Sequence, residues 1–270
     1  MQKFIFMDYK DICLKVTDIC KNVGDFIYNE NKKISQENIE IKGKHDFVTY
    51  VDKTAERKIV DALSELLPES GFIAEENTSD KIGDQYNWII DPLDGTTNFI
   101  HSVPLYAISI ALKQNDEIVV GVVYEINLKE CFYAWKGSNA FLNGKEIHVS
   151  DNKSINDSLI ATGFPYYDYS RLGEYMEIFT YLLQNSRGVR RLGSAAVDLA
   201  YVACGRFEAF YEYGLRPWDV AAGAFIVQQA GGLNFDFEGG SNYIFGKEII
   251  SSNPFIAQEF LSLCKSKFKI

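Results

Sequence analysis

Two aspartates, a glycine and two threonines follow an apolar run near the middle of this chain, and they are the residues best suited to chemistry. They lie in residues 88–98, WIIDPLDGTTN. An apolar run that breaks into such a turn predicts a buried strand whose end presents Asp91 and Asp94. Two carboxylates about 5 Å apart would repel by roughly 3 kcal/mol at an effective dielectric near 20, which favours protonation or a bound cation. A hard cation such as Mg2+ suits these oxygen ligands best.

The same turn also has a purely structural interpretation, because Asp-Pro and Asp-Gly are ordinary turn formers. Pro92 fixes its own φ, and Gly95 lets the backbone approach a ligand closely. Two further segments that carry acids favour chemistry over a simple turn. They are residues 71–76, GFIAEE, and residues 218–223, WDVAAG.

These three segments, in this order, resemble the inositol monophosphatase family of Mg2+-dependent, lithium-sensitive phosphatases. The resemblance spans roughly residues 10 to 265. The central motif is long and specific, whereas Ala74-Glu75-Glu76 is weak on its own. The resemblance implies a layered αβαβα sandwich of mixed α+β and α/β character.

The resemblance also implies two or three Mg2+ ions at one site. Glu75, Asp91 and the backbone carbonyl of Leu93 would hold the first ion. Asp91, Asp94 and Asp219 would hold the second, with Asp91 bridging the two. Asp219 has an alternative role, since an Asp near a helix start interacts well with the helix dipole.

The implied catalytic residues are Thr96 and Asp52. In the family, an Asp inside the pattern DxVTxxD hydrogen-bonds the Thr of the central motif and helps it activate water. Residues 46–52, DFVTYVD, match that pattern. Asp52 could instead serve only as a helix N-cap, which is a favoured position for Asp.

Substrate contacts are implied mainly in the second half of the chain. Glu212 falls at the family position that hydrogen-bonds ring hydroxyls, although a solvated acid at a strand end is the alternative. The other implied substrate contacts are Asp94, Gly95, Thr96, Arg190, Gly193, Ser194, Ala195 and Asp219. Ser194 stands where Thr is common in the family, and Leu105 and Arg216-Pro217 also depart from its usual residues.

The apolar periodicity divides the chain into two subregions of one catalytic unit, residues 1–270. Up to about residue 149 it predicts helices at 8–30 and before Pro68, then an antiparallel meander at 106–113, 117–126 and 130–135. From residue 150 it predicts strands alternating with helices, with Pro254 opening the last helix. No linker rich in Pro, Gly or Ser separates the two subregions.

Composition limits the possible partners and location. The formal net charge is −10 and no basic run stands out, so we expect no nucleic acid as a direct partner. A phosphorylated substrate would be repelled as well, unless bound cations reverse the local field. Five scattered cysteines and the absence of a long apolar run predict a cytoplasmic protein that does not enter a membrane.

The sequence therefore predicts a Mg2+-dependent phosphatase that hydrolyses myo-inositol monophosphates or similar small polyol phosphates. Fructose 1,6-bisphosphate, a nucleotide 3′-phosphate or NADP would be alternative substrates for the same mechanism. A third interpretation is a regulatory role through a protein partner, since some bacterial relatives bind the transcription machinery. The resemblance further implies a homodimer.

Overall fold

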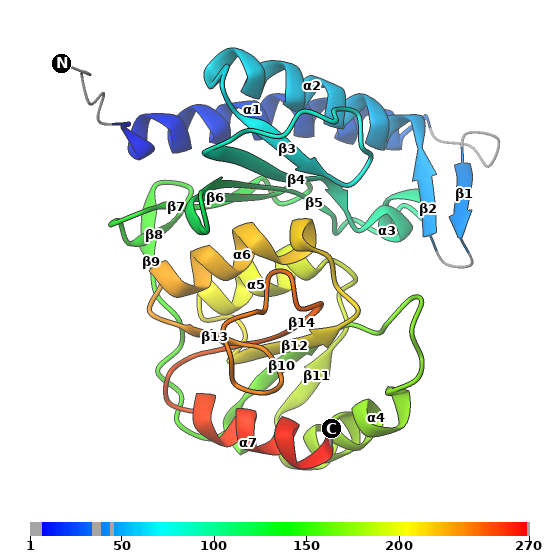
Figure 1. The fold of residues 1–270 in the computed structure, drawn as a ribbon. Coiled ribbons are helices and arrows are strands. Elements are labelled where there is room, and N and C mark those ends of the chain that lie inside the picture. Colours follow the sequence, from blue (N-terminus) through cyan, green and yellow to red (C-terminus); the bar gives the residue numbers. More distant parts are fainter. Residues whose placement is uncertain (1–6, 34–38, 44–45, 269–270) are drawn as a thin grey trace.

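The elements of the chain stack in five layers (Figure 1). The computed structural model describes residues 7–33, 39–43 and 46–268. Two helices cover a seven-stranded sheet, two more helices lie beneath it, and a five-stranded sheet and two last helices follow. This arrangement confirms the predicted αβαβα sandwich.

The first outer layer consists of α1 (Tyr9–Asn31) and α2 (Tyr50–Leu66). Helix α1 begins at Asp8, whose side chain accepts hydrogen bonds from the backbone N–H groups of Lys10 and Asp11, as an N-cap does. Its apolar face repeats at three- and four-residue spacing and is buried against α2 and the first sheet. The predicted helix at 8–30 is confirmed within one residue.

The first sheet has the strand order β3-β4-β5-β6-β7-β8-β9. Strands β3 and β4 are parallel, and the remaining neighbours are antiparallel, as the predicted meander required. Strand β4 carries the central motif, and its pairing with β5 is irregular between Asp91 and Asp94. The strands are β3 (Gly71–Ala74), β4 (Tyr86–Asp94), β5 (Ala107–Gln114), β6 (Glu117–Glu125), β7 (Glu130–Trp135), β8 (Ala140–Leu142) and β9 (Lys145–Ile147).

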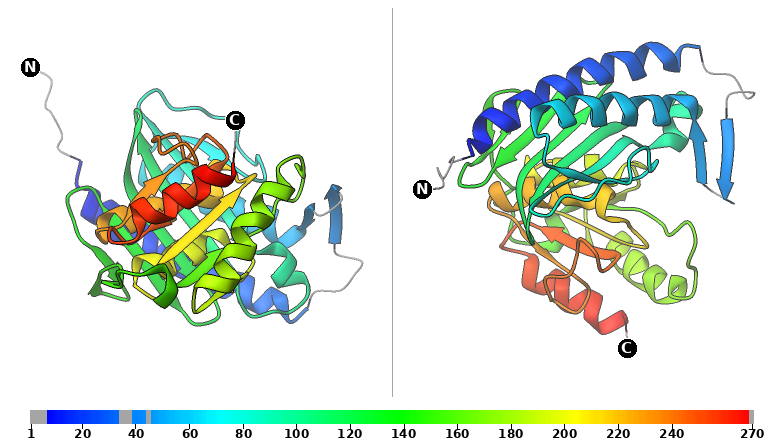
Figure 2. Two further views of the ribbon diagram at one scale, coloured as in Figure 1. Left: turned by 90° about the horizontal axis from the view of Figure 1, so that it is seen from below. Right: turned by 45° about the horizontal axis from the view of Figure 1, so that its top comes forward.

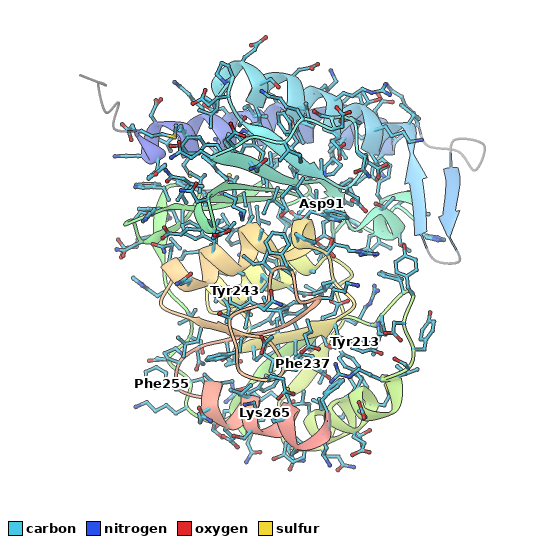
Figure 3. All side chains as sticks on the ribbon, in the orientation of Figure 1. Asp91, Tyr213, Phe237, Tyr243, Phe255 and Lys265 are labelled. Atoms are coloured by element: carbon cyan, nitrogen blue, oxygen red, sulfur yellow. The ribbon has the colours of Figure 1, made fainter. Side chains whose placement is uncertain are left out.

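The middle layer consists of α5 (Ala195–Ala203) and α6 (Pro217–Gln229). Every residue of α5 is buried, because this helix lies between the two sheets. Side chains fill the space between the layers, and Asp91 lies where the first sheet meets the middle helices (Figure 3). The N-termini of both helices therefore lie near the end of β4.

The second sheet has the strand order β11-β10-β12-β14-β13. Helices α4 (Leu172–Asn185) and α7 (Ala257–Lys267) lie across its outer face (Figure 2). The strands are β10 (Leu159–Thr162), β11 (Gly188–Arg190), β12 (Ala209–Tyr213), β13 (Leu233–Phe235) and β14 (Glu248–Ser252), and the short helix η2 (Ile155–Asp157) precedes them.

Some elements differ from the prediction. Pro254 does not open the last helix, because the side chain of Asn253 accepts from the N–H groups of Phe255 and Ile256 and forms a turn first. Strand β13 and the hairpin of β1 (Ile39–Gly43) and β2 (Asp46–Thr49) were not predicted. A further short helix, α3 (Thr96–Ile100), follows the central turn. No helix among the described residues is long and apolar enough to span a membrane.

Candidate active site

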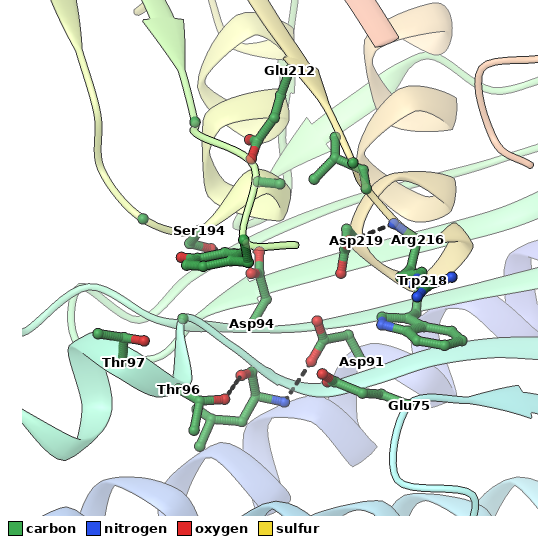
Figure 4. Close-up of a pocket in the computed structure, with 18 of the residues that line it drawn as sticks. Glu75, Asp91, Asp94, Thr96, Thr97, Ser194, Glu212, Arg216, Trp218 and Asp219 are labelled. Carbon is green, nitrogen blue, oxygen red and sulfur yellow. Dashed lines mark hydrogen bonds between the residues drawn. The ribbon is translucent and has the colours of Figure 1, made fainter. Parts of the chain in front are cut away.

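A cavity of about 450 Å3 opens at the end of β4, between the two sheets. Figure 4 shows side chains from strands and helices of both halves of the chain pointing into it. The residues of the sequence analysis that line it are Glu75, Asp91, Leu93, Asp94, Gly95, Thr96, Gly193, Ser194, Ala195, Glu212 and Asp219. Tertiary structure thus brings together segments that are up to 144 residues apart, from Glu75 to Asp219.

Four carboxyl groups line the cavity where β4 ends, those of Glu75, Asp91, Asp94 and Asp219. Burial, and then the charge of Asp219, raises the pKa of Glu75 well above its ordinary value. Burial, and then the charge of Glu75, does the same to the pKa of Asp91. Burial raises the pKa of Asp94 to about 6 and that of Asp219 to about 7. These groups lack enough positive charge around them, which is the condition that a bound cation relieves.

Hydrogen bonds fix these carboxylates but leave oxygen atoms for a ligand. Oδ2 of Asp94 accepts from the Ser194 hydroxyl and from the Ala196 N–H, each at 2.7 Å. Oδ2 of Asp219 accepts from the Arg216 N–H at 2.7 Å. In both residues Oδ1 is left to the cavity, and the Leu93 carbonyl adds a further oxygen. An all-oxygen donor set of this kind fits Mg2+.

The four acids surround the cavity without converging on one point. Within residues 7–33, 39–43 and 46–268, no three His, Cys, Asp or Glu side chains are already placed to hold a metal ion. Glu75 and Asp91 nevertheless lie close enough for one carboxyl group to hydrogen-bond the other.

The turn after β4 owes its shape to Gly95. This residue has φ +101° and occupies the N-cap position of α3. A Cβ here would lie 3.2 Å from the Leu105 carbonyl oxygen, so both conformation and space favour glycine. The Leu93 N–H donates to Oδ1 of Asp91 at 2.9 Å and closes the turn.

Thr96 stands between the cavity and a buried carboxylate. Its Oγ1 lies 3.0 Å from Oδ1 of Asp52 and 3.0 Å from the Leu93 carbonyl oxygen. The hydroxyl has one hydrogen to donate, and its lone pairs can accept from a water in the cavity. Asp52 is only 1% exposed and is the third residue of α2, so it is not the N-cap of that helix.

The far wall of the cavity comes from the second sheet and α5. Glu212 in β12 is 6% exposed and is buried, not solvated. Its carboxylate lies directly against Gly163, where a Cβ would be 2.0 Å from Oε2. Ser194 caps α5 by accepting from the Val197 N–H, and it also donates to Asp94. The Ser194 hydroxyl is therefore already engaged by the protein.

Arg190 does not line the cavity. Its side chain donates to the Val189 carbonyl oxygen, whereas the next residue, Arg191, does line the cavity. Arg191 donates to the Tyr166 hydroxyl at 2.7 Å. The sequence analysis also missed Asp198, a buried acid four residues after Ser194 in the first turn of α5.

Known proteins are similar to this chain in sequence and in fold. The model of the inositol monophosphatase family matches residues 13–267. The Nus factor SuhB of Escherichia coli K12 is 43% identical over 222 residues, which cover 82% of this chain and 83% of that protein. The inositol-1-monophosphatase of Rhizobium meliloti is 41% identical over 221 residues, 82% of this chain and 83% of that protein.

The crystal structure of the extragenic suppressor protein suhB from Bartonella henselae superposes with a TM-score of 0.89 at 37% identity. It covers 94% of this chain and 98% of that one. Sequence and fold agree over nearly the whole length, and the matched region includes every acid that lines the cavity. The chain therefore belongs to the inositol monophosphatase family.

Proposed function

We propose that this chain is a Mg2+-dependent phosphatase that hydrolyses monophosphate esters of small polyols, with myo-inositol monophosphate as the preferred substrate. The observation that carries the proposal is one cavity that combines the buried Asp91 and three partly buried acids, Glu75, Asp94 and Asp219, with the Thr96–Asp52 pair. Metal dependence is general in the family to which the chain belongs. We also propose that residues 1–270 act as one cytoplasmic catalytic unit and assemble as a homodimer.

The proposed metal ligands follow from the donor set of the cavity. Glu75, Asp91 and the Leu93 carbonyl would hold one Mg2+ ion, and Asp91, Asp94 and Asp219 would hold a second. We propose two or three ions per site in all. Bound Mg2+ neutralises the phosphoryl oxygens and lowers the pKa of the attacking water.

Thr96 and Asp52 would orient that water. The water donates to Oγ1 of Thr96, and the Thr96 hydroxyl donates to the buried Asp52 carboxylate at 3.0 Å. Because Asp52 accepts the hydrogen, the Thr96 oxygen keeps its lone pairs toward the cavity. The pair fixes the direction of attack, which is a large part of catalysis in phosphoryl transfer.

The remaining lining residues would bind the ester. The backbone amides of Gly95 and Thr96 lie at the turn and would contact the phosphate. Glu212 would accept hydrogen bonds from hydroxyls of the alcohol. Gly193 and Ala195 leave room beside it, and Arg191 takes the place that the sequence analysis gave to Arg190.

Phosphate release tests this function directly. The purified chain is assayed with and without Mg2+ on inositol 1-phosphate, fructose 1,6-bisphosphate, a nucleotide 3′-phosphate and NADP. We expect Mg2+-dependent turnover with inositol 1-phosphate fastest. A higher rate on another ester would move the function to that substrate, and no turnover of any ester would overturn the proposal.

A second candidate function is regulatory. The 43% identity to proteins named Nus factor SuhB favours a role through a partner in transcription. The expectation that nucleic acid is not a direct partner stays a prediction. If this role is separate from catalysis, expression of the Asp94→Asn variant should restore the wild-type phenotype to a strain that lacks the protein. Failure to restore it would contradict an independent role.

A further inference from the structure

Asp198 is a buried acid beside the cavity, and one of its two carboxyl oxygens has no hydrogen-bond partner in the protein. It lies in the first turn of α5, is 1% exposed and lines the cavity. Its Oδ1 atom has no hydrogen-bond partner. A carboxylate oxygen that has lost water without gaining a partner is destabilising, so this atom is available to a hydrogen-bond donor from a ligand.

The charges around Asp198 indicate what that ligand should be. Burial, and then the charges of Glu212 and Asp94, raises the pKa of Asp198, while Arg191 opposes the shift. Arg191 is shared, because it also donates to the Tyr166 hydroxyl. Asp198 and Glu212 therefore line the same wall of the cavity. The Arg191 guanidinium lowers the pKa of both carboxyl groups, so its charge is divided between them.

We propose that Asp198 and Glu212 each accept a hydrogen bond from a different hydroxyl of the alcohol. Asp198 thereby makes the cavity prefer monophosphate esters of uncharged polyols over esters that carry a second phosphate. This inference rests on the proposed function and narrows its substrate class. Hydroxyls supply the missing donors without adding charge. A fully ionised second phosphate has no hydrogen to donate, so it would leave Oδ1 of Asp198 without a partner.

The test compares Asp198→Asn with wild type on inositol 1-phosphate, fructose 1,6-bisphosphate and an aryl phosphate that has no hydroxyls. We expect kcat/KM for inositol 1-phosphate to fall about 10- to 100-fold, mostly through KM, because the Asn amide replaces one accepting oxygen by an NH2 group. The loss on the aryl phosphate should be at least about tenfold smaller. The relative rate on the bisphosphate should rise. Asp61→Asn, an exposed residue on α2, is the matched control.

Each other outcome overturns the proposal in a distinguishable way. Equal losses on all three esters would mean that Asp198 only supports the fold. An unchanged preference between mono- and bisphosphate would remove its role in selectivity. Failure of wild type to hydrolyse any of the esters would overturn the phosphatase function and this inference together.

A second measurement needs no variant at Asp198, in case Asp198→Asn does not fold. Wild type is assayed on a series of inositol 1-phosphates that each lack one ring hydroxyl. Two positions should show large losses, one for each carboxylate, and Glu212→Gln should abolish the sensitivity at only one of them. Sensitivity at a single position, or loss of both in Glu212→Gln, would overturn the paired arrangement.

Discussion

Gly163→Ala should impair polyol recognition by displacing Glu212. A Cβ at residue 163 would lie 2.0 Å from Oε2, 2.1 Å from Cδ and 2.2 Å from Oε1 of Glu212. The φ of Gly163 is not in the left-handed region, so alanine itself introduces no backbone strain. The Glu212 carboxylate must therefore move by at least about 1.4 Å to restore ordinary van der Waals contact.

The size of the effect follows from the contact that is lost. A hydrogen bond to a charged acceptor contributes about 1.5–3 kcal/mol, which corresponds to roughly 10- to 150-fold in kcat/KM for inositol 1-phosphate. An off-rotamer Glu212 would destabilise the fold by about 0.5–1.5 kcal/mol. The metal ligands come from other segments, so activity on an aryl phosphate should fall much less.

The assay is a double-mutant cycle with Glu212→Gln, measured as kcat/KM on both substrates. If Gly163 acts only through Glu212, the two substitutions together should do little more harm than either alone. Gly173→Ala is the control, because no atom lies within 4 Å of its Cβ position in α4. Additive losses, or equal losses on the aryl phosphate, would refute the reasoning.

Three further predictions concern the metal and the water. Asp94→Asn removes one proposed ligand without a change of volume, so hydrolysis should be abolished while the circular dichroism spectrum is retained; substantial Mg2+-dependent activity would contradict the assignment. Thr96→Val removes the hydroxyl that bonds Asp52, so kcat should fall by about 10²- to 10⁴-fold, with Thr96→Ser as a variant that keeps most of the activity; equal rates for Val and Ser would exclude a role of the hydroxyl. Burial raises the pKa of Asp94 to about 6 and of Asp219 to about 7, from 3.8. An acid whose pKa rises on folding binds its proton more tightly in the folded chain. The free energy of unfolding of the metal-free chain should therefore fall as the pH rises from about 4 to 7, and Mg2+ should stabilise the fold more at the upper end of this range. Thermal melts of wild type and Asp94→Asn would show the same pH slope if this account were wrong.

Much of the local structure could be predicted from the sequence. The apolar period of residues 8–30 determined α1, because a helix buries one face at fixed spacing. Alternating β-branched and aromatic runs determined β5, β6 and β7. The central turn could also be predicted, since Pro92 fixes its own φ and Gly95 permits a backbone conformation that other residues rarely adopt.

Which arginine lines the cavity could not be predicted in the same way. Arg190 is the last residue of β11 and Arg191 follows it. Successive side chains of a strand point to opposite faces, so an error of one residue changes which arginine reaches the cavity. The resemblance implied Arg190, and in the structure Arg191, the residue after β11, lines the cavity instead.

The sequence by itself determined the acids, the turn that carries two of them and the helices and strands on either side. Tertiary structure alone decided that Asp198 lies unpaired beside the cavity and that Glu212 fits against Gly163. The physical reason is the range of the interactions. Periodicity and turn chemistry act between near neighbours along the chain, whereas burial, charge and close contact depend on which strands and helices pack together.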